Sequence, residues 1–158
     1  MISFDQLLSI ARNASQKILS IYSSKNIHVT SKFDDSPLTN ADIASNEAIM
    51  KGLKEFSDFP IVSEESIIEY DNRKEWKKYW LVDPLDGTKD FIAKNNQFTI
   101  NIALINKNEP VLGLVYLPVS GDFYFAKKGH GAFKNNKKIF NNSSREDLSV
   151  MSGSSGLN

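Results

Sequence analysis

Three apolar, strand-like stretches follow one another in the second half of the chain. They cover residues 98–105, 111–117 and 122–126, and short segments rich in Asn, Pro and Gly separate them. A further hairpin is predicted around Asn135 and Asn136, because Asn tolerates the left-handed backbone of tight turns. Strands joined by such short turns run antiparallel. The succession therefore predicts a mostly antiparallel sheet.

Two amphipathic helical patterns precede these strands. In residues 4–23 apolar side chains recur at helical intervals, after Ser3 and Gln6 at the spacing of a capping box. The second pattern opens with Thr39 and Asp42 at the same spacing and continues to about residue 56. Shorter strands are expected at residues 27–33, 59–63 and 79–82, with a break at 34–37 and a polar loop with a turn of helix at 66–78. This order predicts an α+β fold with two N-terminal helices packed on the sheet.

The composition excludes several classes of function. The 158 residues suffice for one domain, and 19 basic residues balance 19 acidic ones, so a broad cationic surface for polymeric nucleic acid is not expected. The absence of cysteine removes disulfides, thiolate nucleophiles and Cys-ligated zinc, and two histidines cannot build a zinc site alone. No apolar run approaches the ~20 residues of a transmembrane helix. The N-terminus lacks a signal-peptide pattern, so a cytoplasmic location is expected.

The segment at residues 83–88, Asp-Pro-Leu-Asp-Gly-Thr, follows an apolar run directly. Its proline and glycine indicate a turn that brings Asp83 and Asp86 together with the Leu85 carbonyl and the Thr88 hydroxyl. Two close carboxylates repel each other unless a cation or a proton lies between them. Ligands made only of oxygen suit Mg²⁺. The alternative is a capped turn leading into a short helix.

Acids at two other element ends strengthen the metal interpretation. Asp42 lies in the first turn of the second helix, where it could simply stabilise the helix terminus. Glu64 and Glu65 follow a buried-looking strand, although such a pair is usually solvated surface. Acids at the ends of neighbouring core strands favour a site, because desolvated like charges need a counter-ion.

Nucleophilic triads, glycine-rich phosphate loops and zinc-hydrolase motifs are absent from the sequence. Metal-assisted phosphoryl transfer to water remains. In this interpretation Thr88 orients the water, and Asp42 lies behind it as the proton acceptor.

These residues resemble a known family. Asp42, Glu64, Glu65 and the segment at 83–88 are similar to the signature of the lithium-sensitive, magnesium-dependent phosphatases, which include inositol monophosphatases, fructose-1,6-bisphosphatases and bisphosphate nucleotidases. Residues 36–42, 79–92 and 98–105 resemble the bacterial CysQ-type branch of 3′(2′),5′-bisphosphate nucleotidases. The resemblance extends from about residue 4 to residue 150 and implies the N-terminal half of the sugar-phosphatase fold.

The resemblance also implies roles for individual residues. Mg²⁺, more than one ion in the complete family site, would be bound by Glu64, Asp83, the Leu85 carbonyl and Asp86. The catalytic candidates are Asp42 and Thr88, which would act on the attacking water, and Glu65. The substrate phosphate would contact Glu64, Leu85, Asp86, Gly87 and Thr88, where amides at a helix start suit an anion. The implied substrate is a small phosphorylated nucleotide, adenosine 3′,5′-bisphosphate, which would lose its 3′-phosphate to give AMP.

The chain departs from the family pattern near its end. The family carries a further metal-binding aspartate in a Trp-Asp-x-Ala-Ala-Gly motif of a second α/β domain, and the match fades at residues 149–158. We therefore expect a metal-binding domain at residues 1–145 and the start of a junction at 146–158, with the C-terminal α/β domain absent. Such a chain should bind Mg²⁺ weakly and have little or no phosphatase activity.

Three alternatives stay open. One is an inositol monophosphatase-like phosphatase. Another is a non-catalytic fragment that self-associates through the face left by the missing domain. The third is a plain calcium- or magnesium-binding domain, although the EF-hand spacing is absent.

Overall fold

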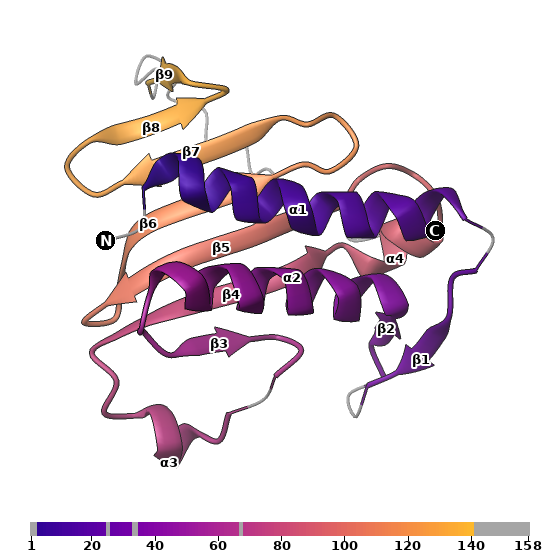
Figure 1. Ribbon diagram of the computed structural model, residues 1–158, viewed down its shortest axis with the longest axis horizontal. Helices are drawn as coiled ribbons and strands as arrows, with labels where there is room; N and C mark the ends of the chain where they lie inside the picture. Colours follow the sequence, from indigo (N-terminus) through magenta and orange to yellow (C-terminus); the bar gives the residue numbers. More distant parts are fainter. Residues whose placement is uncertain (1–2, 25, 33–34, 67, 141–158) are drawn as a thin grey trace, which may run out of the picture.

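A computed structural model describes residues 3–24, 26–32, 35–66 and 68–140. The helices are α1 (Phe4–Ser23), α2 (Asn40–Phe56), α3 (Tyr70–Arg73) and α4 (Thr88–Ile92). The strands are β1 (Val29–Ser31), β2 (Pro37–Thr39), β3 (Ile61–Ser63), β4 (Lys78–Asp86), β5 (Thr99–Asn106), β6 (Glu109–Tyr116), β7 (Phe123–Lys127), β8 (Gly131–Lys134) and β9 (Lys137–Ile139). The long helices α1 and α2 lie side by side against the sheet (Figure 1). The predicted α+β class is confirmed.

Both predicted capping boxes are present. At α1, the Ser3 hydroxyl accepts a hydrogen bond from the Gln6 N–H at 3.2 Å, and the Gln6 side chain accepts one from the Ser3 N–H at 2.7 Å. Thr39 and Asp42 make the same reciprocal pair at α2. These bonds satisfy N–H groups that have no partner within the helix. They explain why the two helices begin where the sequence predicts.

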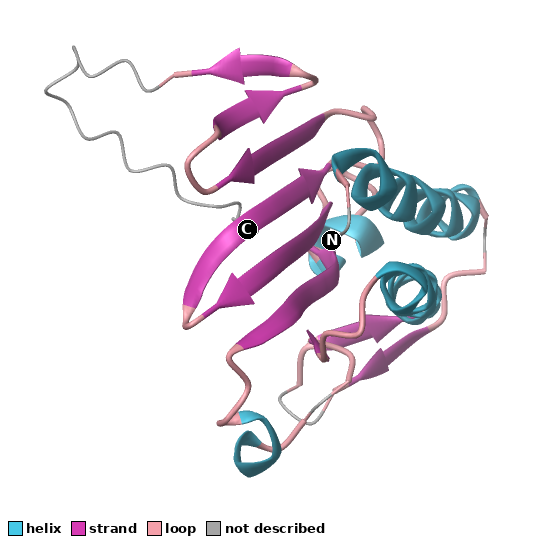
Figure 2. Ribbon diagram, turned by 60° about the vertical axis from the view of Figure 1, so that its left-hand side comes forward, coloured by secondary structure: helices cyan, strands magenta, loops and turns pink. Residues whose placement is uncertain are grey.

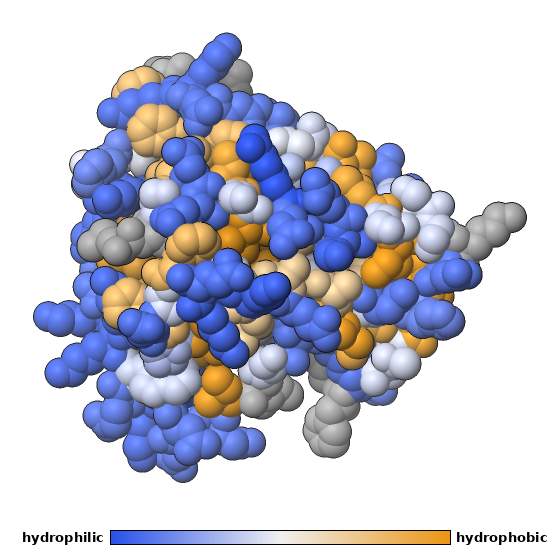
Figure 3. All heavy atoms as spheres, viewed as in Figure 1, coloured by the Kyte–Doolittle hydropathy of each residue, from blue (hydrophilic) through white to orange (hydrophobic). Residues whose placement is uncertain are grey.

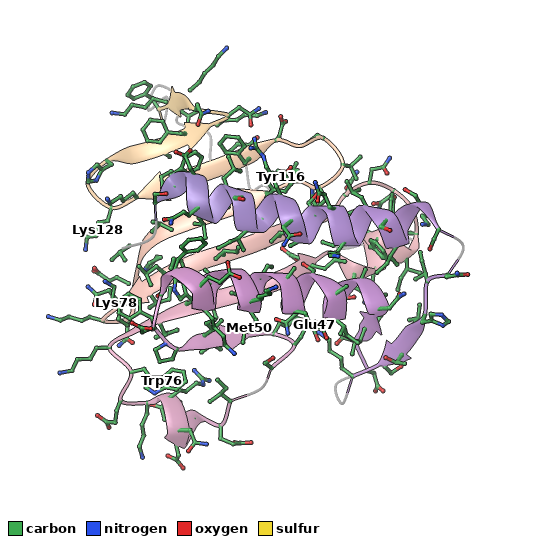
Figure 4. The ribbon with its side chains drawn as sticks, in the orientation of Figure 1. Glu47, Met50, Trp76, Lys78, Tyr116 and Lys128 are labelled. Carbon is green, nitrogen blue, oxygen red and sulfur yellow. The ribbon has the colours of Figure 1, made fainter. Side chains whose placement is uncertain are left out.

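The two helices approach each other closely. A Cβ atom added to Gly52 of α2 would lie 2.7 Å from Cγ1 of Ile10 in α1, so only glycine fits there without a shift. Apolar side chains of α1 and α2 face the sheet, whereas polar side chains such as Glu47 project from α2 to the solvent (Figure 4). On this side the molecular surface is mostly hydrophilic (Figure 3).

The main sheet has the order β3-β4-β5-β6-β7-β8-β9. All neighbours in it pair antiparallel, as predicted, except β3 and β4, which are parallel. A parallel pair needs a crossover, and the segment between these strands, which contains α3, supplies it. Because β3 and β4 run in the same direction, the residues that follow them lie at the same end of the sheet.

Two details differ from the sequence prediction. The apolar strand expected to stop at Val82 continues as β4 to Asp86, with a register shift between Asp83 and Asp86 where Pro84 offers no N–H to the ladder. The segment expected only to break the chain before Thr39 forms β2, which pairs with β1 in a separate two-stranded sheet. Short ribbon pairing of this kind depends on the partner strand, which local sequence does not show.

The two faces of the main sheet differ in their environment. Side chains alternate along β4, so that Trp80 and Val82 are buried beneath the helices while Leu81 is 45% exposed on the other face. Among the described residues no helix covers that other face (Figure 2). A hollow of about 570 Å³ lies on it, lined mainly by apolar side chains that include Leu81, Val115 and Tyr124. We call this surface, which also includes Ile139, the open sheet face.

Several expectations fall outside the described residues. They concern Phe33 and Asp34 in the predicted strand and break, and the polar end of the chain from residue 141, including the proposed junction at 146–158. In the described part of the chain, no helix has the length and apolar character to cross a membrane.

Candidate functional site

The parallel pairing of β3 and β4 brings two acids to one sheet edge. The register places Ser63 opposite Val82, so the next residues, Glu64 and Asp83, are neighbours. The Glu64 N–H donates to the Val82 carbonyl at 3.1 Å and extends the ladder beyond β3. The two carboxylates that the sequence assigned to separate strand ends therefore lie beside each other.

Asp83 is electrostatically linked to both of the other proposed ligand acids. Burial raises the pKa of Asp83 to about 7, and the charges of Glu64 and Asp86 and a hydrogen bond with Glu64 add to this shift. The Leu85 N–H, which donates to Asp83 Oδ1 at 3.2 Å, opposes it. Each neighbouring negative charge favours the protonated form, because it repels the carboxylate. The raised pKa of Asp83 is therefore the expected consequence of burial first, and of the two neighbouring acids second.

Asp86 lies at the outer side of this group. Its carboxylate is exposed, and Oδ2 accepts a hydrogen bond from the Asn101 side chain at 3.0 Å. Among the described residues, no three acidic or histidine side chains are gathered closely enough to hold an ion as they stand. The donor atoms suit a hard cation, since they are all oxygens. Enclosing an ion would require these side chains to turn inward.

Lys32 supplies the positive charge in this region. Its Nζ donates to Oε1 of Glu64 at 2.6 Å and to Oε1 of Glu65 at 2.8 Å. Burial works to lower the pKa of Lys32, but these bonds hold it above its ordinary value. Burial also raises the pKa of Glu65, against the effect of Lys32. We call Glu64, Glu65, Asp83 and Asp86 the acid cluster.

A second group of polar atoms adjoins the acid cluster. Asp42 is only 1% exposed, and its Oδ2 accepts hydrogen bonds from the Thr39 N–H at 2.8 Å and the Thr39 hydroxyl at 2.5 Å. The Thr88 hydroxyl lies 3.1 Å from Asp42 Oδ1 and 3.2 Å from the Leu85 carbonyl, and its one proton can go to either. This arrangement allows the Thr88 hydroxyl to pass its proton to the buried Asp42 carboxylate.

The turn that joins the two groups is conformationally specific. Gly87 has a φ of 93°, and a Cβ atom there would lie 2.8 Å from the Gln97 carbonyl oxygen, so glycine is required. The Ser45 hydroxyl of α2 donates to the Pro84 carbonyl at 2.7 Å, which ties the helix to the same turn. The structure brings all of the sequence-predicted site residues into one region, formed by the residues directly after β3, the end of β4 and the starts of α2 and α4.

Sequence reasoning missed three residues of this region. Lys32 stood inside a predicted strand, Asn101 alternated outward on another strand, and Ser45 was one polar residue within a helical pattern. None of them belongs to a spaced motif, so the sequence offered no signal for a role. Their contacts depend on which elements become neighbours.

The raised pKa of Asp83 predicts how pH affects the stability of the metal-free protein. Since the folded-state pKa of about 7 exceeds the ordinary 3.8, the folded state binds the proton more tightly between these values, and stability falls as pH rises through this window. From pH 5 to pH 8, the parent should lose about 2 kcal/mol more of its unfolding free energy than Asp83→Asn, with screening of the partly buried carboxyl limiting the effect. Urea denaturation in the presence of a chelator measures the difference. Identical pH dependence of the two proteins would contradict the prediction.

Known proteins share this fold and much of this sequence. A family model described as the inositol monophosphatase family matches residues 3–156. The 3′(2′),5′-bisphosphate nucleotidase CysQ of Escherichia coli strain K12 is 49% identical over 127 residues, which are 79% of this chain and 52% of that protein. CysQ of Haemophilus influenzae is 37% identical over 149 residues, covering 90% of this chain and 55% of that protein.

Solved structures agree with the sequence comparison. The crystal structure of CysQ from Bacteroides thetaiotaomicron, described as a bacterial member of the inositol monophosphatase family, has a TM-score of 0.71 at 45% identity and covers 82% of this chain and 47% of that chain. This chain thus spans about half the length of the relatives that it matches. From its fold, the grouping of its acids and these likenesses, the chain belongs to the inositol monophosphatase family.

Proposed function

We propose that this chain carries metal-binding residues of a Mg²⁺-dependent phosphomonoesterase that acts on 3′(2′),5′-bisphosphate nucleotides. The observation that carries the proposal is the contact between the acid cluster and the Asp42–Thr88 pair through the turn at residues 83–88. The name 3′(2′),5′-bisphosphate nucleotidase, borne by relatives at up to 49% identity, supports this substrate class over inositol phosphates. With adenosine 3′,5′-bisphosphate, the oxygen of water bonds to phosphorus as the bond from phosphorus to the 3′-oxygen breaks. The 3′-oxygen takes up a proton from the surrounding water, which gives AMP and inorganic phosphate.

Different residues of this chain have different roles in the proposed reaction. Glu64, Asp83, Asp86 and the Leu85 carbonyl would hold Mg²⁺, which polarises phosphate oxygens and lowers the pKa of water. The Thr88 hydroxyl orients the attacking water and donates its own proton to Asp42 as it receives one. Asp42 suits this role because its other oxygen is fixed by Thr39.

The remaining candidates lie around these groups. Glu65 is a further catalytic candidate, and it adjoins Glu64 through their shared partner Lys32. The substrate phosphate would lie against Glu64 and the turn at residues 85–88. A small phosphorylated nucleotide, and no polymeric nucleic acid, is the expected partner, and a cytoplasmic location stays a prediction that cell fractionation checks.

Asp83→Asn tests the metal ligands. The amide keeps the shape of the side chain but removes the charge, so affinity for Mn²⁺, used as a spectroscopic substitute for Mg²⁺, should fall at least ~10-fold with little change in fold. Electron paramagnetic resonance measures free Mn²⁺, and circular dichroism checks the fold. Asp58→Asn, in an exposed loop, is the matched control and should bind like the parent. Equal affinity of Asp83→Asn and the parent would refute the ligand assignment.

We expect full activity to require the part of the relatives that these 158 residues do not match. Because this chain matches about half of them, we expect it alone to release phosphate at least ~100-fold more slowly than the full-length Escherichia coli CysQ under the same Mg²⁺ concentration. A fusion of this chain to the C-terminal half of that relative should prefer adenosine 3′,5′-bisphosphate to inositol 1-phosphate. Turnover by the chain alone at the rate of the relative, or the opposite preference in the fusion, would contradict the proposal.

The open sheet face favours the second candidate, a non-catalytic chain that self-associates through this face. Apolar side chains that no described helix covers gain from contact with another apolar surface. The chain should therefore sediment with a mass that increases with concentration. Val115→Lys, on this face, should weaken association at least ~10-fold, because a charge there resists burial.

The matched control for that experiment is Val119→Lys. Val119 is 44% exposed in the turn between β6 and β7, close to the 38% of Val115, and should leave association unchanged. Sedimentation velocity of the three proteins measures the difference. A parent that stays monomeric at every concentration, or a Val115→Lys variant that associates like the parent, would exclude this face as the contact.

A further inference from the structure

Lys32 is held in place at the tip of the β1–β2 ribbon. Its N–H donates to the Ser36 carbonyl at 2.8 Å, and its carbonyl accepts from the Asp35 N–H at 3.1 Å. The backbone of Lys32 is therefore held by two hydrogen bonds, and only its side chain reaches across to the acid cluster. The ribbon contributes one cation to a region otherwise lined by acids.

The two glutamates that Lys32 contacts differ in their access to water. The Glu65 side chain is 8% exposed, whereas that of Glu64 is 49% exposed. A carboxylate with so little water around it depends on its ion pair, since unpaired burial of a charge is costly. Glu64 can exchange the ammonium for water or for another cation at a much smaller cost. The bond to Glu64 is the shorter one, at 2.6 Å against 2.8 Å, but the ion pair with the buried Glu65 is costlier to break.

Glu64 also contacts Asp83, with which it shares a hydrogen bond. Its carboxylate is therefore in contact with Lys32 through Oε1 and with Asp83 as well. A divalent ion held by Glu64 would share that carboxylate with the Lys32 ammonium. Two cations on one carboxylate repel each other.

We propose that Lys32 is a positioning residue that competes with the divalent cation for Glu64. Its ammonium holds Oε1 of Glu64. On metal binding, Glu64 would release Lys32 and bind the ion together with Asp83, while Lys32 remains with Glu65. Lys32 thereby sets the metal affinity of the site without contacting the metal. This inference rests on the proposed function, because it requires the ion at the acid cluster.

The direction of one measurable effect separates this role from a structural one. If Lys32 merely supported the arrangement of the glutamates, its removal would loosen them and weaken metal binding. If Lys32 competes with the metal, its removal leaves Glu64 free and removes a repulsive charge, so binding becomes tighter. At the same time the metal-free protein becomes less stable, because Glu65 loses its partner.

The test is a titration of the 158-residue chain with Mn²⁺, followed by electron paramagnetic resonance at fixed pH and ionic strength. Lys32→Met should bind Mn²⁺ about tenfold more tightly than the parent and should melt at a lower temperature without metal. Lys32→Arg, which keeps the charge, should bind like the parent. Lys17→Met, on the exposed side of α1, removes the same charge at a distance and should also bind like the parent.

The outcomes distinguish this inference from the proposed function. A parent that binds no Mn²⁺, or binds it no better than Asp83→Asn does, overturns the metal site and the inference together. A parent that binds through Asp83, with Lys32→Met equal or weaker in affinity, overturns the role of Lys32 alone. A matching rise in affinity for Lys17→Met also overturns it, since net charge would then explain the effect.

A second variant keeps the test decisive if Lys32→Met does not fold. In Lys32→Met with Glu65→Gln, the buried glutamate is not left with an unpaired charge, and the net charge equals that of the parent. Tighter Mn²⁺ binding by this double variant reports the release of Glu64 itself. Affinity equal to or weaker than that of the parent overturns the inference.

Discussion

The parallel pairing of β3 with β4 is the constraint on which the candidate site depends. The other neighbouring strands of this sheet are antiparallel. Because β3 and β4 run in the same direction, Glu64 lies beside Asp83. Side-by-side carboxylates repel each other, and the neighbouring contacts reduce that cost. Asp83 has a raised pKa, Asp86 accepts a hydrogen bond from Asn101, and Lys32 pairs with both glutamates. A raised pKa, a hydrogen bond and an ion pair thus each reduce the repulsion among the carboxylates of the acid cluster.

The helical layer contributes to the same edge. The Asp42 side chain serves first as part of the capping box of α2, and its other oxygen contacts Thr88 across the helix–sheet boundary. Ser45, about one turn further along α2, donates to the Pro84 carbonyl. A group that stabilises the helix terminus is thereby also placed next to the turn at residues 83–88. Stability and the proposed chemistry draw on the same hydrogen bonds.

Local sequence predicted the helices and most strands because their signals are local. Capping boxes and helical periodicity located α1 and α2, and apolar, strand-like stretches between turn residues located β5 and β6. Two features were missed for a physical reason. Strand β2 exists because β1 lies beside it, and β4 continues past Pro84 because Asp86 pairs again with Thr99. Pairing with another strand outweighed the local turn residues in both cases.

The sequence by itself determined the α+β class, the acids at the ends of consecutive elements, and their likeness to one phosphatase family. These follow from residue type and spacing, which are properties of the chain read in order. Only the tertiary structure decided that β3 and β4 run parallel, that one sheet face has no helix over it among the described residues, and that Lys32 joins two glutamates. The pairing of β3 with β4 and the contacts of Lys32 join residues that are more than twelve positions apart in the sequence. They arise from packing, for which no short stretch of sequence carries a signal.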